Sequence, residues 1–209
     1  IELSRVKLSA NWMAACGEPG EDAALYETVR AVGMELCPAL GISIPVGKDS
    51  LSMRTQWQDG DSQKKVTSPV SLIVTAFATL ADVRGTLTPQ LDATEADTTL
   101  VLVDLGRGRN RLGGSVLEQT LNQAGTDAAG VPDLEQPQDL VNLVNAVNAL
   151  RAKGQVLAYH DRSDGGLFAA AAEMAFAGNV GVALNVDMLV LEGDGINDSR
   201  MDTGDAKNW

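Results

Sequence analysis

Segments with the periodicity of a helix alternate along the chain with segments that have the periodicity of a strand, and this alternation constrains the fold most. Residues 21–37 carry apolar side chains at steps of three and four residues, begin with two acids and reach Pro38, which predicts an amphipathic helix that ends at this proline. Residues 68–80 alternate with period two and are rich in Val, Ile, Thr and Phe, which predicts a half-buried strand. The same reasoning predicts strands over residues 42–46, 98–105, 155–160 and 180–186, and helices over residues 114–123, 139–151 and 165–177. This order indicates an α/β (α+β) fold.

Polar stretches mark the predicted limits of the domains. Residues 56–65 are predicted to form an exposed connection between two strands. Residues 86–97 contain a proline and several polar side chains, so we predict the domain boundary here, with a first domain over 1–96 and a second over 97–209. Residues 192–209 are polar, rich in Gly and Asp and aperiodic, which predicts a loop or a frayed tail.

The charge and the apolar runs exclude two classes of partner from our expectations. The chain has 16 basic and 28 acidic residues, a net charge of -12, and its Lys and Arg are scattered, so we expect no binding of nucleic acid. Its apolar runs are far shorter than the roughly 20 residues that span a bilayer, so we expect no membrane partner. The first residues have neither Met nor the pattern of a secretion signal, which suggests that further protein lies upstream.

The most informative stretch for chemistry, residues 158–167, joins a predicted strand to the start of the predicted helix 165–177. In α/β layers such junctions bind ligands. Asp161 is a hard oxygen donor suited to Mg²⁺, Ser163 offers a hydroxyl, and the two glycines that open the helix suggest close approach of backbone to a phosphate. The alternative is that Ser163 or Asp164 only caps the helix and the glycines shape a turn, and the spacing does not decide between the two. The helix itself is apolar almost all round, which favours burial against a sheet.

Other reactive side chains are weaker candidates. His160 is the only histidine and ends a predicted strand, where a packed role is commoner than proton transfer. Lys48 follows a glycine as in a P-loop, but Asp49 and the spacing of the preceding glycine depart from that motif. Cys16 and Cys37 lack the spacing of metal ligands and are typical of reduced thiols in a cytoplasmic protein.

Six blocks of sequence carry a family resemblance. They are residues 7–16 (Lys-Leu-Ser-Ala-Asn-Trp-Met-Ala-Ala-Cys), 19–22 (Pro-Gly-Glu-Asp), 45–50 (Pro-Val-Gly-Lys-Asp-Ser), 88–90 (Thr-Pro-Gln), 160–166 (His-Asp-Arg-Ser-Asp-Gly-Gly) and 173–178 (Glu-Met-Ala-Phe-Ala-Gly). In order and spacing they resemble the large, single-chain form of phosphoribosylformylglycinamidine synthase, over about residues 3–187. That family of ligases converts formylglycinamide ribonucleotide to its amidine in purine biosynthesis. It uses ATP to activate the amide oxygen and ammonia from glutamine.

The resemblance implies a fold and a set of partners. The synthetase core of the large form consists of two pseudo-symmetric halves, each similar to aminoimidazole ribonucleotide synthetase, and this chain resembles the second half. It would supply the later part of an N-terminal-type domain, up to about residue 96, and the earlier part of the C-terminal-type domain that follows. The remainder of the core and the glutaminase domain are the implied partners, and the isolated chain is expected to be inactive.

The resemblance also implies roles for two residues. Asp161 would be a Mg²⁺ ligand and Ser163 a contact to ATP or ADP, which agrees with the interpretation drawn from the residues themselves. Other metal ligands of the family come from a Glu-containing helix that would precede Ile1, and we assign no catalytic residue in this chain. Two roles remain open for the nucleotide: it takes part in the ligase reaction, or it is a structural ligand that is never turned over.

Overall fold

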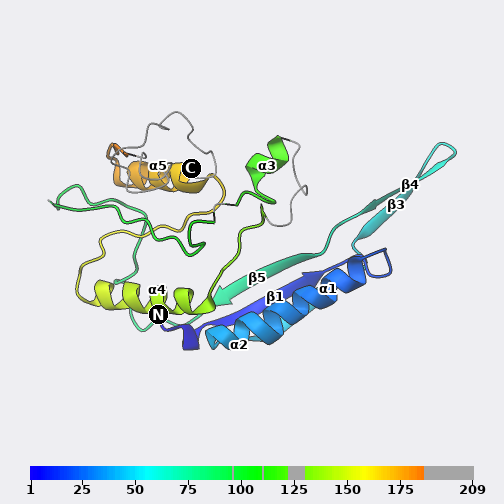
Figure 1. The fold of residues 1–209 in the computed structure, drawn as a ribbon, viewed down its shortest axis with the longest axis horizontal. Helices are drawn as coiled ribbons and strands as arrows, with labels where there is room; N and C mark the ends of the chain where they lie inside the picture. The colour runs from blue at the N-terminus through cyan, green and yellow to red at the C-terminus, as the bar shows by residue number, and fades with distance from the viewer. Residues whose placement is uncertain (96, 110, 122–129, 186–209) are drawn as a thin grey trace. The chain divides into compact units, whose positions relative to one another are not determined.

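The computed structural model describes residues 1–95, 97–109, 111–121 and 130–185 (Figure 1). Contacts along the chain group it into two compact units. The first consists of Ile1–Val83 with Gln136–Asn148, and the second of Arg84–Glu135 with Ala149–Trp209. None of the helices in the described ranges is long and apolar enough to cross a membrane.

A three-stranded sheet forms the centre of the first unit. Strand β1 (Lys7–Met13) lies between β2 (Ser43–Ser50), to which it is parallel, and β5 (Ser71–Phe77), to which it is antiparallel. Parallel neighbours must be joined by a crossover, so the helical stretch between β1 and β2 follows from this pairing. The strands predicted over 42–46 and 68–80 are confirmed as β2 and β5, whereas β1 has no counterpart among the predicted strands.

The crossover is one helical stretch that runs alongside β1 (Figure 1). Its three parts are α1 (Glu21–Arg30), the π-helical segment η2 (Ala31–Leu36) and α2 (Cys37–Leu40). The prediction that the helix ends at Pro38 is wrong, because the chain stays helical to the end of α2 and is terminated by Gly41 at φ +67°. Proline has no N–H for the carbonyl four residues earlier. The π segment just before it, in which the Cys37 N–H donates to the Val32 carbonyl, widens the backbone and accommodates that loss.

The polar residues 56–65 belong to a hairpin. Strands β3 (Arg54–Asp59) and β4 (Ser62–Thr67) pair antiparallel, with Asp59 opposite Ser62. Gly60, at the first position of the two-residue loop, has φ +61°, a backbone that this kind of tight turn requires. The prediction of an exposed connection is therefore right about exposure and wrong about structure.

A carboxylate attaches this hairpin to the residues that follow β1. The Glu18 side chain is only slightly exposed and accepts a hydrogen bond from Lys65 Nζ at 2.6 Å, and Arg54 lies 3.7 Å away. Arg54 also donates to the carbonyl of Cys16 at 3.1 Å. A two-stranded hairpin alone is marginally stable, so these contacts hold it against the rest of the first unit.

Within the described residues, the buried apolar side chains are few and lie in the first unit. They are Leu8, Ala10, Ala14, Ala15, Cys37 and Leu40. They come from β1, from the residues that follow it and from α2, so the described core consists of the central strand and the end of the crossover helix.

Helices are the regular elements described in the second unit. They are α3 (Val116–Thr120), the last residues of α4 (Pro137–Ala152), which begins in the first unit, and α5 (Gly166–Gly178). The helices predicted over 139–151 and 165–177 are confirmed. The helix predicted over 114–123 is confirmed as the shorter α3, and its last two residues lie outside the described residues.

The other expectations for this unit need correction. The strands predicted over 98–105, 155–160 and 180–186 are wrong for the described residues, because none of these segments pairs with another strand. A strand is stable only where a neighbour satisfies its backbone groups, and the apolar side chains of residues 100–103 all stay exposed. The expected burial of α5 is also wrong, because Phe168 and Phe176 are 70% and 72% exposed. Val186 and the tail predicted over 192–209 lie outside the described residues.

Candidate functional site

The loop of residues 158–167 enters α5 through two glycines. Gly165 is the N-cap residue at φ +86° and Gly166 has φ +60°. The Gly166 N–H donates to the Ser163 carbonyl at 2.9 Å, which closes the turn. No side chain hydrogen-bonds to the cap, so the prediction that Ser163 or Asp164 caps the helix is wrong. The accompanying prediction that the glycines shape the turn is correct.

The helix also approaches this turn closely. A Cβ atom added to Gly165 would lie 2.5 Å from the Cβ of Ala169, one turn further along α5. Real Cβ atoms do not come so close, so position 165 accepts only glycine without a shift of backbone. The glycine is therefore fixed by the path of the chain, whatever binds there.

At its start, the loop is hydrogen-bonded to a distant segment of the same unit. The Tyr159 N–H donates to the Thr88 carbonyl at 2.9 Å. At the other end of α5, a Cβ on Gly178 would lie 2.6 Å from the Leu91 carbonyl oxygen. The segment around residues 88–91 thus runs past both the loop and the end of α5.

His160 lies between two carboxylates. Its Nε2 atom is 2.5 Å from Glu173 Oε2 on α5, and its Nδ1 atom is 3.5 Å from Asp161 Oδ1. The pKa of His160 is raised, mainly by its hydrogen bond with Glu173, against the lowering effect of desolvation. The expectation of a packed histidine is correct, because the His160 side chain is only 19% exposed. Its contacts with two carboxylates hold the ring as well.

Asp161 and Ser163 both face solvent. The Asp161 side chain is 81% exposed, and Ser163 is exposed as well. The hydroxyl of Ser163 has no hydrogen-bond partner among the residues that the structure describes, and its carbonyl closes the turn to Gly166. Both groups are thus available to a ligand.

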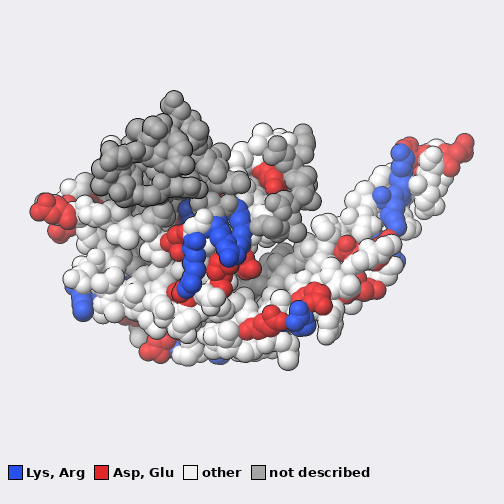
Figure 2. All heavy atoms as spheres, viewed as in Figure 1, with Lys and Arg blue, Asp and Glu red and all other residues white. Residues whose placement is uncertain are grey.

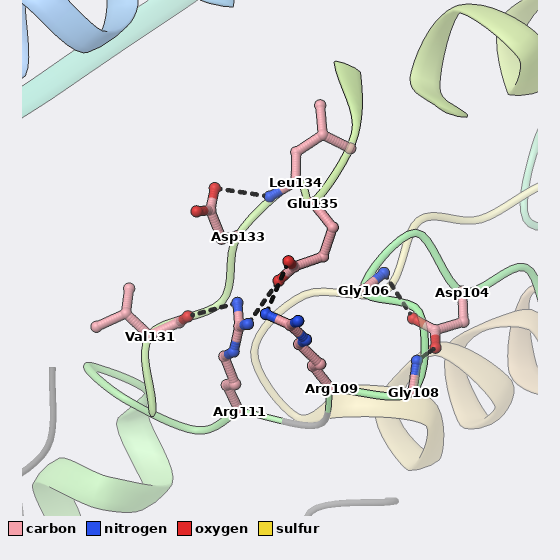
Figure 3. Close-up of polar contacts among 9 residues, drawn as sticks. All are labelled: Asp104, Gly106, Gly108, Arg109, Arg111, Val131, Asp133, Leu134 and Glu135. Carbon is pink, nitrogen blue, oxygen red and sulfur yellow. Dashed lines mark hydrogen bonds and ion pairs between the residues drawn. The ribbon is translucent and has the colours of Figure 1, made fainter. Parts of the chain in front are cut away.

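Residues 104–109 and Arg111 belong to a second loop, whose polar contacts are drawn in Figure 3. Asp104 accepts hydrogen bonds from the N–H of Gly106 at 2.8 Å and from the N–H of Gly108 at 2.6 Å, so a single carboxylate shapes this loop. The same carboxylate is 3.9 Å from a guanidinium nitrogen of Arg162, which lies between Asp161 and Ser163. Sequence reasoning missed this loop, although alternating glycines after an apolar run indicate a turn whose amides need an acceptor.

Glu135 holds the far end of the same loop (Figure 3). Its oxygens lie 2.9 Å from Arg109 and 2.5 Å from Arg111, and Arg111 also donates to the Val131 carbonyl at 3.3 Å. The side chains of Arg111 and Glu135 are 16% and 18% exposed, so this pair is shielded from water more than a surface ion pair. Because the Glu135 carboxylate contacts both arginines, it clamps this end of the loop.

The charges around the site restrict the ligands it can take. Figure 2 shows acidic side chains on several parts of the visible face and a group of basic ones near its centre, and the chain as a whole has a net charge of -12. The net negative charge of the chain repels a free polyphosphate, and a cation beside the phosphate offsets that repulsion. The described residues contain no group of three His, Cys, Asp or Glu side chains that could hold a metal ion. Mg²⁺ bound with a nucleotide commonly takes one or two carboxylates and completes its shell with phosphates and water, and one exposed carboxylate, Asp161, fits that pattern.

The lysine and the two cysteines considered in the sequence analysis do not belong to this loop. Lys48 donates to Ser50 Oγ at 2.9 Å within β2. Desolvation raises the pKa of Cys16, with the neighbouring Asp22 adding to the effect, and burial raises the pKa of Cys37. Neither thiol is disulfide-bonded, and a raised pKa leaves little reactive thiolate at neutral pH.

Two family models match the chain. Residues 1–79 match the FGAR-AT PurM_N-like domain, and residues 96–202 match the C-terminal domain of AIR synthase related proteins. The second match covers just over half of the chain. The two domain types occur in the predicted order, and with the mixed helices and small sheets of the structure they confirm the predicted fold class. The predicted boundary at residue 97 stays a prediction.

Proposed function

Because the chain belongs to the family of AIR synthase related proteins, we propose that it is part of a phosphoribosylformylglycinamidine synthase. Domains of this family occur in ATP-using synthetases and ligases of purine biosynthesis. The proposed reaction converts formylglycinamide ribonucleotide, glutamine and ATP to formylglycinamidine ribonucleotide, glutamate, ADP and phosphate. The observation that carries the proposal is the match of residues 1–79 to a domain type named for this amidotransferase, followed by the C-terminal domain type.

Within this function, the 158–167 loop is the proposed Mg-nucleotide site. Asp161 would ligate Mg²⁺ and Ser163 would donate its hydroxyl to a phosphate of ATP or ADP. The support is physical: both groups are exposed, the turn behind them is fixed by two glycines, and the Asp161 carboxylate would hold the Mg²⁺ whose positive charge a phosphate needs on a chain of net negative charge. The remainder of the synthetase core and the glutaminase domain are the proposed partners, and the cytoplasm is the proposed location.

A structural nucleotide is the second candidate. The observation that favours it is that, in the part of the chain that the structure describes, the loop is joined to the segment near Thr88 by a backbone hydrogen bond and to α5 by the contact between His160 and Glu173, so a ligand contacting the loop would brace them. A ligand that binds only the native state stabilises it by RT ln(1 + [L]/Kd), about 2.7 kcal/mol at a hundredfold excess over Kd. A bracing nucleotide would therefore affect melting before it affected turnover.

Calorimetry with Mg-ADP and Mg-ATP, repeated with EDTA in place of Mg²⁺, tests the site. We expect binding with Mg²⁺ that is lost with EDTA and lost in Asp161→Asn. Chromatography of the nucleotide recovered from the intact enzyme, after incubation with its substrates, separates the two candidates, because a structural ATP is recovered intact whereas a reacting one is recovered as ADP. The absence of Mg-dependent binding to the wild-type chain, or equal binding by Asp161→Asn, would contradict the site.

The ligase assignment has its own test in the intact enzyme. Formation of formylglycinamidine ribonucleotide from purified enzyme, glutamine and ATP should be lost when this chain's region is deleted and restored when it is supplied in trans. Restoration by an unrelated acidic protein of similar size would refute a specific role.

A further inference from the structure

We propose that one face of the three-stranded sheet binds a sugar phosphate, with Lys48 and Ser50 donating to the phosphate and Asn11 contacting a hydroxyl of the sugar. The inference goes beyond the proposed function, because it places a ligand on residues of the first unit that take no part in the 158–167 loop. It also gives a role to Lys48, whose surroundings depart from the P-loop motif.

The binding face is the one that the crossover helix leaves open. Successive residues of a strand point to opposite faces, and Leu8 and Ala10 of β1 are buried, so Ser9 and Asn11 belong to the other face. The pairing register adds to this open sheet face the β2 residues Val46, Lys48 and Ser50 and the β5 residues Ser71, Ile73, Thr75 and Phe77. Its outer strands are accessible, since Val46, Ile73 and Phe77 are 57%, 56% and 51% exposed.

The open sheet face is positive on a chain that is acidic as a whole. The charged residues of the three strands are Lys7, Lys48 and Asp49, and the alternation along β2 places Asp49 on the opposite face from Lys48. The open sheet face therefore presents lysines and no acid, whereas the chain has a net charge of -12. A ligand that complements this face is an anion.

Lys48 and Ser50 form a pair of donors at the end of β2. Lys48 Nζ donates to Ser50 Oγ at 2.9 Å and to the Asp49 carbonyl at 3.3 Å. The ammonium has a third hydrogen, and a hydroxyl that accepts from Lys48 keeps its own hydrogen to donate. Within the described residues neither of these hydrogens meets an acceptor. Two neighbouring donors, one of them charged, suit the oxygens of a phosphate monoester.

The backbone holds this pair in place. The Ser50 carbonyl accepts a hydrogen bond from the Ala14 N–H at 2.9 Å, and β2 pairs with β1 from Ser9 to Met13 without a further change of register. Groups on a paired strand keep their positions better than groups on a loop, so the donors are ready for a ligand before it arrives.

Asn11 distinguishes a sugar phosphate from a bare phosphate. It lies at the centre of the open sheet face, between Lys48 and Ile73. Its Oδ1 atom is buried and accepts no hydrogen bond from any described residue, although buried polar atoms normally have a partner. A phosphate dianion has no hydrogen to donate, whereas a sugar hydroxyl has one. The amide torsion of Asn is soft, so the carboxamide can turn toward a hydroxyl held beside Lys48.

The competing explanation is that these side chains only support the sheet. Lys48 and Ser50 would then stabilise the end of β2, and Asn11 would fill space between its neighbours. Under that explanation, replacing any of them changes the stability of the free chain and affects no ligand. The two explanations therefore separate when stability and affinity are both measured.

Calorimetry on the chain, with ribose 5-phosphate as the probe, tests the site. We expect ribose 5-phosphate to bind, unphosphorylated ribose not to bind, and inorganic phosphate to bind at least about 10-fold more weakly. Lys48→Gln should weaken binding of ribose 5-phosphate about 10-fold or more, because it removes a charge-assisted hydrogen bond. Lys64→Gln is the matched control, since Lys64 is a half-exposed lysine of the same unit with Asp59 3.7 Å away, and it should have no effect. Equal losses in the two variants, no loss in either, or equal binding of inorganic phosphate would overturn the proposal.

Asn11→Leu separates a ligand contact from a packing role, because leucine has nearly the shape of asparagine and no polar atom. Replacing an unsatisfied acceptor by an apolar group should leave the free chain at least as stable in urea unfolding. Its affinity for ribose 5-phosphate should fall about 10-fold while its affinity for inorganic phosphate is unchanged. A less stable chain with undiminished affinity for ribose 5-phosphate would show that Asn11 only packs, and the proposal would be wrong.

A nitrogen-15 correlation spectrum locates the ligand and keeps the two sites apart. Ribose 5-phosphate should shift the side-chain amide signals of Asn11 and the backbone amide of Ser50, and Mg-ADP should shift amides near Ser163 instead. If ribose 5-phosphate shifts Asn11 and Mg-ADP shifts nothing, the sugar phosphate site stands and the nucleotide site falls. If Mg-ADP shifts the amides near Ser163 and ribose 5-phosphate leaves Asn11 unchanged, the nucleotide site stands and the sugar phosphate site falls.

Discussion

Replacing Gly165 with alanine should destabilise the chain through two separable effects. The first is backbone strain, because Gly165 has φ +86° and an L-residue in the left-handed region costs about 1–2 kcal/mol. The second is steric, because the new Cβ would lie 2.5 Å from the Cβ of Ala169. That atom is fixed to the helix backbone and has no rotamer to escape into, so we expect a further cost of about 1–3 kcal/mol, typical of overpacking.

A matched control isolates the steric part. Gly154, in the same unit, has φ +70° and no atom within 4 Å of an added Cβ. Gly154→Ala should therefore carry only the backbone cost, and the difference between the two variants should be about 1–3 kcal/mol. For a unit of this size each kcal/mol lowers the melting temperature by roughly 4–8 °C, so the difference is measurable.

Urea unfolding followed by circular dichroism measures the free energies, and hydrogen exchange shows where the cost falls. The Ala169 N–H donates to the Gly165 carbonyl at 3.2 Å, so relief of the clash by fraying should speed exchange of this amide first. If both variants lose the same stability, and exchange at Ala169 is unchanged in Gly165→Ala, the tight entry to α5 is not present in solution and the argument for a rigid turn fails.

Three further predictions concern single carboxylates and a hydroxyl. Asp161→Asn and Ser163→Ala should each lower the melting temperature of the intact enzyme and release bound nucleotide while the folded molecules keep most of their turnover; loss of turnover at unchanged melting temperature would place this loop at a catalytic ATP site instead. The pKa of Glu18 is lowered, chiefly by the hydrogen bond from Lys65, so the stability that this carboxylate contributes is present above its unfolded pKa and is lost as the pH falls through the lowered value. Glu18→Gln should therefore lose less stability than the wild type between pH 7 and pH 3. A urea midpoint that falls by the same amount in both proteins over this range would contradict the prediction. Glu135→Gln leaves two arginines with one weakened partner, and urea unfolding should show a loss of about 1–3 kcal/mol in the free energy of unfolding. The loss should be the same at low and at high salt, because the contact is shielded from water; a loss that disappears in high salt would mark an ordinary surface ion pair.

The spacing of apolar residues was sufficient to predict those helices and strands whose structure depends on their own residues. The crossover helix, α4 and α5 follow from apolar spacing, and β2 and β5 follow from alternation. Pro38 shows the limit of that reasoning, because a proline usually ends a helix, but here the π-helical turn before it absorbs the missing hydrogen bond. The hairpin was missed because its residues are polar on both faces, so period-two burial gives no signal, and the turn glycine was the only evidence.

Strands that depend on distant partners could not be judged from the sequence. The central strand β1 has neighbours from residues 43–50 and 71–77, and it is a strand because both pair with it. The apolar runs near residues 100 and 157 also contain residues favoured in strands, but neither pairs with a strand in the described part of their unit. β-propensity describes how well a segment would pack in a sheet, whereas the presence of neighbouring strands is decided by the tertiary structure.

The candidate site also contains residues that the sequence predicted and residues that only the structure revealed, and the two groups have different surroundings. Asp161, Ser163 and the glycines were found from the sequence because they are adjacent, whereas Asp104 and Glu173 were missed because they act across long stretches of chain. The residues that sequence reasoning missed are those that hold the two loops: each is an acceptor already engaged by backbone N–H groups or by a ring nitrogen. The two it found are exposed, and holding a turn does not require an exposed carboxylate. A loop held in place by one set of polar groups while another set faces water has the organisation expected of the proposed ligand site, because the hydrogen bonds that hold the turn come from other residues and leave the Asp161 side chain 81% exposed.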